Sequence, residues 1–524
     1  MNTSISNSAS SSDRARWLWL VPLVLAGAMA SVTVDGQWVY DDRHAILESP
    51  VVQGQVSLGE ALQRDFWGHK LGNPSKVSWR PALPLIWRAL SNVSGGDPGP
   101  TRALAILAHI FATWALMRVV RSLHGSTVAI WVGALFALHP AHAEALGGVV
   151  GQADILAAGC GLMAMASLAE MGRSFALKTF VWLLVGALFK EVIVLYALVC
   201  LVLLIALRGK RPLNALHCAG LVGFVLLVAL VQNYAHGGHA EHPKDNVIAA
   251  LPMFERFING LAIFWRGIRV SFLPFDVAAN HGYAQYSEDI GPVLGAAALG
   301  GAVLFASVWA GVRWLLGGKP AHALWLSFGV GPALAQSHLL FVGPTEFAER
   351  LLYGGVGAAC VVVVLLLTNL RVSPEARNKL SASVLVVLCG LFALGSWQAQ
   401  RPWRAPLALW EHTLQREPLA WRAHHNYGDA LTKNGQTQRG LWHLMMGVWL
   451  KRRLPKAVPL EVVQGLAAVE PTERLLMSPG VLNKNAPCVL IDGLIRAAYS
   501  GADFADSART ARQIFAQRYP CAKR

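Results

Sequence analysis

The chain has 524 residues, of which 54% are hydrophobic and only 14% are charged, and its formal net charge is +15. A soluble domain usually contains about 25% charged residues, so this composition argues against a soluble globular protein. The basic residues are scattered between apolar runs instead of clustering on one soluble face, which argues against nucleic-acid binding and favours Lys and Arg that orient membrane spans.

The apolar residues occur in runs of roughly 17 to 25, the length that a helix needs to cross a bilayer. The first run begins at residue 17 and follows a short tail, residues 1–16. It lacks a clear small-x-small cleavage site and is long enough to span, so we interpret it as a retained span and not as a signal peptide. The sequence therefore predicts an all-α, polytopic membrane protein.

About eleven spans are predicted from the spacing of the apolar runs and the basic loops. They lie at 17–34, 99–119, 126–139, 151–170, 176–189, 191–207, 214–232, 291–312, 321–342, 350–369 and 380–397. Six basic clusters alternate with them and are assigned to the cytoplasm, at 13–16, 117–124, 172–178, 208–212, 312–319 and 371–379. The N-terminus is then cytoplasmic, whereas the loop 35–98 and the tail 398–524 lie on the outer side.

An acidic pair, Asp41 and Asp42, follows the first span directly. A carboxylate at the lipid–water boundary is partly desolvated, and a second carboxylate beside it raises the pKa of one member further. One of the pair is therefore a candidate general base. The alternative is that the pair caps the helix expected at residues 43–49.

Other ionisable residues of the outer side fall at the ends of predicted spans, where such groups are costly and are candidates for a functional site. They are Arg80, His139, His142, Glu144, Asp154, Lys190, Glu191, Glu349 and Arg350. Each has a simpler alternative: Arg80 can snorkel to the interface, Lys190 and Glu191 can be interface anchors, and Glu349 and Arg350 can form a local ion pair.

His139, His142 and Glu144 resemble a set of metal ligands. Their spacing does not bring all three to one face of a helix, and Pro140 breaks the helix there. We therefore expect no metal, with a divalent ion as a minor alternative, and a role in hydrogen bonding. The His-rich loop 236–243 is expected to be a solvated loop.

Two further segments are ambiguous. Residues 256–275 place three Arg on an apolar frame and are expected to form an interfacial or re-entrant helix on the outer side. The tail 398–524 contains one unit, at 418–436, with the pattern of a tetratricopeptide helix pair. Cys488 and Cys521 lie in this tail, and a disulfide between them is left open.

Several short stretches resemble, in the same order, the GT-C glycosyltransferases, and specifically the protein O-mannosyltransferase-like proteins whose spans are followed by tetratricopeptide repeats. They are VYDDRHAILESPVV (39–52), SWRPALPLIW (78–87), HPAHAEALGGVVGQADILAA (139–158), FKEV (189–192), FLPFDVAANHGYAQ (272–285), FAERLLY (347–353) and PLAWRAHHNYGDALTKNGQ (418–436). Gln152 departs from the family pattern, which often has Arg before Asp154.

The resemblance implies a GT-C-type membrane domain over 17–397 and an inverting glycosyltransferase. This enzyme would move a sugar, mannose by analogy, from a polyprenyl-phosphate carrier to an acceptor hydroxyl on a protein or glycan. It implies Asp41 or Asp42 as the base, and Arg80, Lys190 and Arg350 as support for the donor phosphate. His139, His142, Glu144, Asp154, Glu191 and Glu349 would act as acceptor-binding or supporting residues.

The short loops and the tail favour a bacterial inner-membrane protein with a periplasmic tail, and no cofactor is expected. Two other interpretations compete with this one. A transporter would favour inverted repeats and charges within spans, and neither is seen. A non-catalytic membrane scaffold acting through its tail is the remaining alternative.

Overall fold

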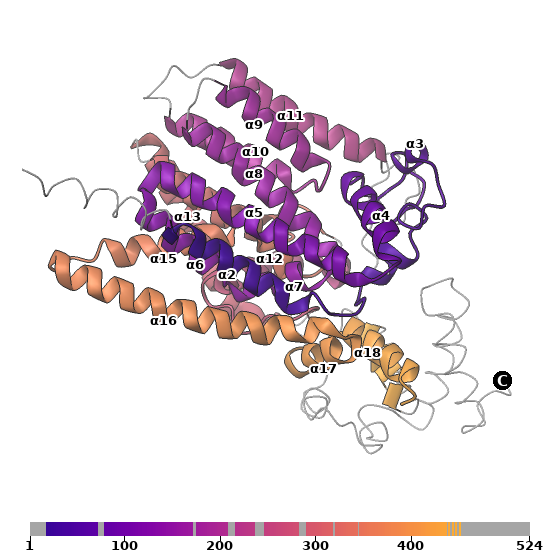
Figure 1. The fold of residues 1–524 in the computed structure, drawn as a ribbon. Helices are drawn as coiled ribbons and strands as arrows, with labels where there is room; N and C mark the ends of the chain where they lie inside the picture. Colours follow the sequence, from indigo (N-terminus) through magenta and orange to yellow (C-terminus); the bar gives the residue numbers. More distant parts are fainter. Residues whose placement is uncertain are drawn as a thin grey trace, which may run out of the picture.

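The computed structural model describes residues 17–71, 78–170, 174–207, 215–235, 246–281, 290–317, 320–343, 345–436 and parts of 439–451. Within these ranges the chain is helical and has no β-strand (Figure 1). Each predicted span coincides with a helix. In chain order these are α2 (Leu20–Ala30), α5 (Pro98–His124), α6 (Ser126–Ala137), α8 (Gln152–Glu170), α9 (Phe175–Ala187), α10 (Ile193–Leu207), α11 (Ala215–Ala235), α13 (Leu294–Leu316), α14 (Pro320–Ala335), α15 (Val356–Thr368) and α16 (Pro374–Gln400).

Five helices in the described ranges are long and apolar enough to cross a membrane. They lie at Pro98–His124, Val149–Glu170, Ala215–Ala235, Gly291–Trp314 and Pro374–Arg404. The other apolar helices at predicted spans have 10–17 residues. These helices support the predicted class of integral membrane protein, while the full number of spans stays a prediction.

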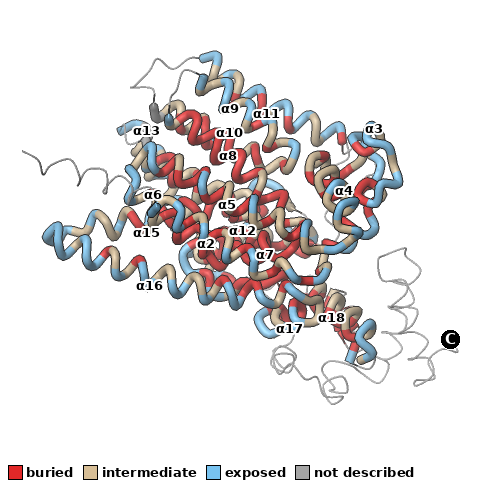
Figure 2. Tube along the Cα trace, viewed as in Figure 1, coloured by how far each residue is buried: buried red, intermediate tan, exposed pale blue. Residues whose placement is uncertain are grey.

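Helix α8 is the centre of the bundle. In the apolar window of this helix 89% of the residues are buried, and Figure 2 shows it buried along its length. Small residues let its neighbours approach closely: a Cβ atom at Gly159 would meet the ring of Phe111 on α5, and one at Gly161 would meet the ring of Tyr196 on α10. Close helix packing through Gly and Ala is typical of membrane bundles, where lipid supplies no hydrophobic driving force.

The outer helices show the opposite pattern. Only 17% of the apolar windows of α11, α13 and α16 is buried, although these windows are among the most hydrophobic in the chain. Leu230 on α11 and Val386 on α16 are 66% and 60% exposed. Large apolar side chains facing outward in this number are expected for surfaces in contact with lipid.

Helix ends follow local sequence signals. Asp97 accepts a hydrogen bond from the Gly99 amide at the start of α5, with Pro98 in the first turn. Ser373 does the same for Ala376 at the start of α16. These caps satisfy amides that have no partner within the helix.

The segment expected to be an interfacial or re-entrant helix forms one continuous helix, α12 (Met253–Phe272). It buries Asn259 and Arg266 but exposes Met253 and Phe254, so it is amphipathic as predicted. It is absent from the span candidates in the described ranges. Its placement in the interface stays a prediction.

Polar loops gather at one end of the bundle, which we call the loop end (Figure 1). It carries residues 35–71 and 78–97, including α3 (Leu58–Ala61) and α4 (Ala82–Ser94), and the helices α17 (Pro406–Arg416) and α18 (Trp421–Lys433). These two helices pack against each other. The tetratricopeptide unit predicted at 418–436 contains only α18 of the two, and it stays a prediction. Cys488, Cys521 and the His-rich loop 236–243 lie outside the described residues.

Close packing at α8 gives a test of the fold. A Cβ atom at Gly161 would lie 2.2 Å from a ring carbon of Tyr196, whereas one at Gly223 on α11 would meet nothing within 4 Å. We expect Gly161→Ala to lower the free energy of unfolding by about 1–3 kcal/mol through overpacking. Gly223→Ala should change it by less than about 1 kcal/mol, in the stabilising direction. Thermal unfolding in detergent measures both, and equal melting temperatures would contradict the packing of α8 on α10.

Candidate active site

The structure separates the acidic pair into a buried and a partly exposed member. Asp42 is 1% exposed and accepts hydrogen bonds from the amides of Val39 (3.1 Å) and Val149 (2.8 Å). Arg102 of α5 contacts the same carboxylate at 3.3 Å. No side-chain cap is made to the short helix at 43–47, so the capping alternative is wrong for Asp42. The hydrogen bond from Val149 attaches the loop after α2 to the turn that precedes α8.

Burial raises the pKa of Asp42 to about 7, against the opposing effects of Arg102 and the two amides. A carboxyl with this pKa has useful proton affinity near neutral pH. Its oxygens, however, are turned toward the protein interior. The pKa therefore reflects the cost of burying this carboxylate, whose oxygens already accept from two amides and contact Arg102.

Asp41 is partly exposed and follows a residue with unusual backbone geometry. Tyr40 has φ = 52°, in the left-handed region that a bulky residue rarely adopts, and its ring packs edge-on against Trp410 of α17 at 4.9 Å. Strain of this kind clusters at functional sites.

Lys190 is buried in an ion pair with Asp154 of α8, at 2.6 and 2.7 Å from the two carboxylate oxygens. The neighbouring residue Glu191 points elsewhere and forms a two-bond pair with Arg80, at 2.9 and 2.6 Å. Lys190 is thus no interface anchor, and Arg80 does not snorkel as an unpaired cation. Burial lowers the pKa of Lys190, and Asp154 opposes this effect.

Arg350 pairs with Glu144, not with the adjacent Glu349. Its amide donates to Glu144 at 2.9 Å, and its guanidinium contacts the same carboxylate. Burial lowers the pKa of Arg350. Three nearby acids outweigh this effect and raise the pKa above its usual value, in decreasing order Glu144, Asp154 and Asp41. The local Glu349–Arg350 ion pair is therefore wrong. Charges from the loop after α2, from α7 (Ala143–Gly147) and from α8 act on one guanidinium.

Glu349 belongs to a second cluster that the sequence did not predict. Its Oε1 accepts from Nε2 of His281 at 2.8 Å, and Nδ1 of His281 lies 2.9 Å from Glu417 at the end of α17. Arg266 of α12 also donates to Glu417, at 2.8 Å, and lies 2.7 Å from the same ring nitrogen. All four side chains are at most 8% exposed.

The charge state of His281 follows from these neighbours. Burial and then Arg266 lower its pKa, but Glu349 and Glu417 outweigh them and raise the pKa to about 9. A protonated ring donates to Glu349 through Nε2 and to Glu417 through Nδ1, whereas a neutral ring accepts at Nδ1 from Arg266, which lies 2.7 Å away. With the ring protonated, two acids and two cations make the cluster neutral overall, which favours burying such groups.

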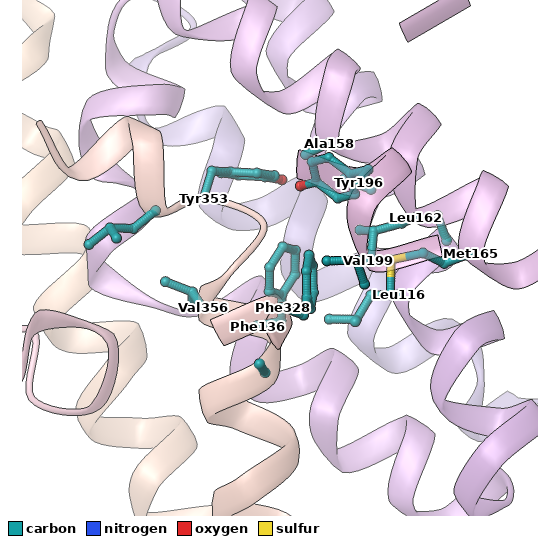
Figure 3. Close-up of a cluster of buried hydrophobic side chains, with 14 of the residues drawn as sticks. Leu116, Phe136, Ala158, Leu162, Met165, Tyr196, Val199, Phe328, Tyr353 and Val356 are labelled. Carbon is teal, nitrogen blue, oxygen red and sulfur yellow. The ribbon is translucent and has the colours of Figure 1, made fainter. Parts of the chain in front are cut away.

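A cavity of about 200 Å³ lies between α8, α10, α14 and residues 350–354. Its walls are apolar, whereas Asp154 and Arg350 stand at its margin; the remaining lining residues are Ala158, Val192, Leu195, Tyr196, Leu198, Val199, Val202, Ser327, Phe328, Gly331, Pro332, Leu351, Tyr353 and Gly354. Figure 3 shows the hydroxyls of Tyr196 and Tyr353 directed toward each other in this region. An apolar chamber with a cation at one side suits an amphipathic anion.

His139 and His142 lie in the core, 1% and 0% exposed. Nε2 of His139 donates to the Ser271 carbonyl at 3.2 Å, and the ring of His142 packs against that of Tyr353 at 4.4 Å. Glu144 points to Arg350 instead. Among the described residues, no group of three or more His, Cys, Asp or Glu is placed to hold a metal ion.

Sequence reasoning missed Arg102, His281 and Glu417. His281 lies within the stretch 272–285 that carried part of the resemblance, so the stretch was noticed but the side chain was not. Arg266 was interpreted only as part of an amphipathic face. Glu417 comes directly before the tetratricopeptide-like unit at 418–436. Nothing in the local sequence pattern there indicates a partner more than one hundred positions away.

Comparison with known proteins places this geometry in context. Protein O-mannosyl-transferase Tmtc1 of Drosophila melanogaster is 40% identical over 137 residues, which are 26% of this chain and 16% of that protein. A protein O-mannosyl-transferase of Caenorhabditis elegans is 24% identical over 419 residues, which cover 77% of this chain and 58% of the relative. This chain is similar to protein O-mannosyl-transferases over part of their length. The predicted resemblance is thereby confirmed.

These alignments cover only part of each protein O-mannosyl-transferase, at most 58% of the relatives just named. No family model matches the chain. Among solved structures, apo ArnT from Cupriavidus metallidurans aligns over 93% of this chain and 80% of its own, with a TM-score of 0.39 and 15% identity. That overlap is too weak to assign the fold, so the GT-C type stays a prediction.

Gln152, the departure from the protein O-mannosyltransferase pattern, has a structural role here. Its Oε1 accepts from the indole of Trp87 at 2.9 Å, and its amide nitrogen donates to the Thr101 carbonyl at 2.7 Å. It is fully buried. The residue therefore joins α8 to α4 and α5.

The buried pair of Lys190 and Asp154 gives a test on stability. Asp154→Asn leaves an ammonium buried without its counter-charge, for which we expect a loss of about 3–5 kcal/mol. Glu170→Gln, on the same helix, breaks a pair with Arg118 that is 25–30% exposed and should cost less than about 1 kcal/mol. Thermal unfolding in detergent compares the two, and similar losses would contradict the burial of the Lys190 pair.

His281 gives a test on pH. Its folded pKa of about 9 exceeds the ordinary 6.5, so its charge stabilises the fold fully below pH 6.5 and the stabilisation is lost as the pH rises through about 9. The contribution is at most about 3 kcal/mol. We expect the melting temperature to fall more steeply between pH 7 and pH 10 in the wild type than in His281→Gln. Parallel profiles would instead indicate a neutral ring that accepts from Arg266.

Proposed function

We propose that the protein is a membrane glycosyltransferase that moves a sugar from a polyprenyl-phosphate carrier to an acceptor hydroxyl, with inversion at the anomeric carbon. Mannose is the first sugar to test, because the relatives are named protein O-mannosyl-transferases. The observation that carries the proposal is the apolar cavity lined by Arg350. The partly exposed Asp41 is one of the acids that raise the pKa of this Arg350.

A lipid phosphate needs an apolar path for its chain and a cation for its head group. The cavity between α10 and α14 offers the first, through residues such as Leu195, Val199 and Phe328. Arg350 offers the second, because a guanidinium suits the geometry of phosphate oxygens. An exposed apolar surface on the neighbouring helices is consistent with access from the bilayer.

The reaction needs one proton acceptor and one leaving group. In the proposed step Asp41 takes the proton of the acceptor hydroxyl, and the hydroxyl oxygen forms a bond to the anomeric carbon. The bond between that carbon and the phosphate oxygen breaks, and its electron pair leaves with the lipid phosphate. Arg350 stabilises the charge that develops on the phosphate. Asp42 holds the loop in place.

Each candidate phosphate ligand is already engaged by a carboxylate. Lys190 pairs with Asp154, Arg80 with Glu191, and Arg350 with Glu144. We propose that Arg350 makes the main phosphate contact, since it alone of the three lines the cavity. Arg80 and Lys190 contribute to the positive potential of the same end. Glu144, Asp154, Glu191 and Glu349 orient these cations, and His139 and His142 support the segment behind them.

The proposed partners are the lipid-linked sugar, an acceptor protein or glycan, and membrane lipid, and the reaction requires no cofactor. The proposed orientation places the loop end outside a bacterial inner membrane, with the tail periplasmic and the N-terminus cytoplasmic. The gathering of basic residues at the opposite end of the bundle supports this orientation, for example Arg121 at the end of α5 and Arg313 at the end of α13.

The decisive experiment measures transfer of radiolabelled mannose from polyprenyl-phosphate mannose to a cell-envelope protein extract by the purified protein. We expect Asp41→Asn to lower the rate at least about 100-fold, as loss of a general base does. The melting temperature of this variant should be unchanged. Arg350→Gln should lower the rate and also weaken binding of the donor.

Two matched variants control this experiment. Asp35→Asn removes an acid that is 58% exposed in the same loop and should keep full activity. Asp42→Asn removes an acceptor from three donors and should lower the melting temperature. Equal rates for the wild type and Asp41→Asn would remove Asp41 from the chemistry. Absence of transfer from a panel of lipid-linked sugars would favour a non-catalytic scaffold.

A further inference from the structure

The segment 346–350, which ends in Arg350, makes two buried polar contacts that lead to the helix pair α17–α18. One runs through His281 to Glu417 at the end of α17, and the other joins Glu346 to Arg422 of α18. Glu346 and Glu349 are 4% and 1% exposed, so neither contact is a surface ion pair. Buried pairs of this kind hold geometry more tightly than exposed ones do.

The first contact reaches the segment from α17. Glu417, at the end of that helix, bonds to His281, and His281 donates to Glu349 at 2.8 Å. Glu349 also accepts from the amide of Ala278 at 3.3 Å. Glu349 precedes Arg350 in the chain, so a continuous line of bonds runs from the tail to the residue beside the proposed phosphate ligand.

The second contact reaches the same segment from α18. Arg422, in the first turn of this helix, donates to Glu346 at 3.0 Å. Between the two carboxylates the ring of Phe347 lies against Arg266, with the guanidinium carbon 5.2 Å from the ring centre, and against His281 at 5.1 Å. The helix pair thus fixes the segment at Glu346 and at Glu349.

We propose that His281 and Arg422 are positioning residues through which the tail helix pair α17–α18 sets Arg350 for the donor phosphate. The inference rests on the proposed function for its ligand. It assigns the tail a part in donor binding, beyond any contact that the tail makes with an acceptor. A displacement of about 1 Å in a positioning group can lower the rate about 100-fold. Small movements of the tail would therefore move Arg350 relative to the donor phosphate.

The test uses the full chain in detergent and two readouts. Glu417→Gln weakens the link through His281, and Arg422→Gln removes the link through Glu346. The control is Lys433→Gln, which breaks an exposed pair with Asp429 on the same helix α18. Hydrogen–deuterium exchange reports the order of residues 346–353, and binding of polyprenyl phosphate in detergent reports the donor site.

We expect both test variants, but not the control, to raise amide exchange in 346–353 and to weaken binding of polyprenyl phosphate by about 10- to 100-fold. Arg422→Lys, which keeps a donor for Glu346, should restore most of the binding. In an Arg350→Gln background the test substitutions should add little, because the group that they position is already absent. A merely structural role would give additive losses.

Unchanged exchange in 346–353, or losses that add to those of Arg350→Gln, would overturn the inference. The two proposals fail in different ways. If the wild type does not bind polyprenyl phosphate, the proposed donor is wrong, whereas the exchange data still decide whether the tail orders this segment. If the wild type binds and the variants bind equally well, the positioning role alone is wrong.

Discussion

Burial of charge at one end of an apolar bundle is the constraint on which this structure depends. An ionised side chain removed from water is costly unless an opposite charge and hydrogen bonds compensate it. At the loop end Asp42 meets Arg102, Lys190 meets Asp154, and Arg350 meets Glu144. Each pair joins segments that are distant in the chain, so the requirement for neutrality also fixes how these segments assemble.

The same requirement gives the two halves of the acidic pair different tasks. Asp42 is satisfied by a buried cation and two amides, which fastens the loop after α2 to the start of α8. Asp41 stays partly exposed beside a residue in a left-handed conformation. One carboxylate that attaches the loop and a second that stays exposed suit a site that must be both rigid and open to an acceptor.

Much of the fold was predictable from the sequence because apolar run length and loop charge are local signals. Helices stand at every predicted span, and α12 is amphipathic as its pattern indicated. Several of the ionisable residues noticed at span ends, such as Asp154, Lys190 and Glu144, prove to be buried in ion pairs, whereas their role in a site stays a prediction. Their pairing was not predictable: Glu349 was expected beside Arg350 and instead meets His281, and the capping role considered for Asp42 is absent.

By itself, the sequence determined the class of the protein, the positions of its helices, the family that it resembles and the set of charged residues at one end. Only the tertiary structure decided which of these charges meet, which acid is buried, and that α17 and α18 contact the segment before Arg350. The physical reason is that helix formation depends on residues within a few turns. A buried ion pair such as that of Arg266 and Glu417 depends on two surfaces that meet only after folding.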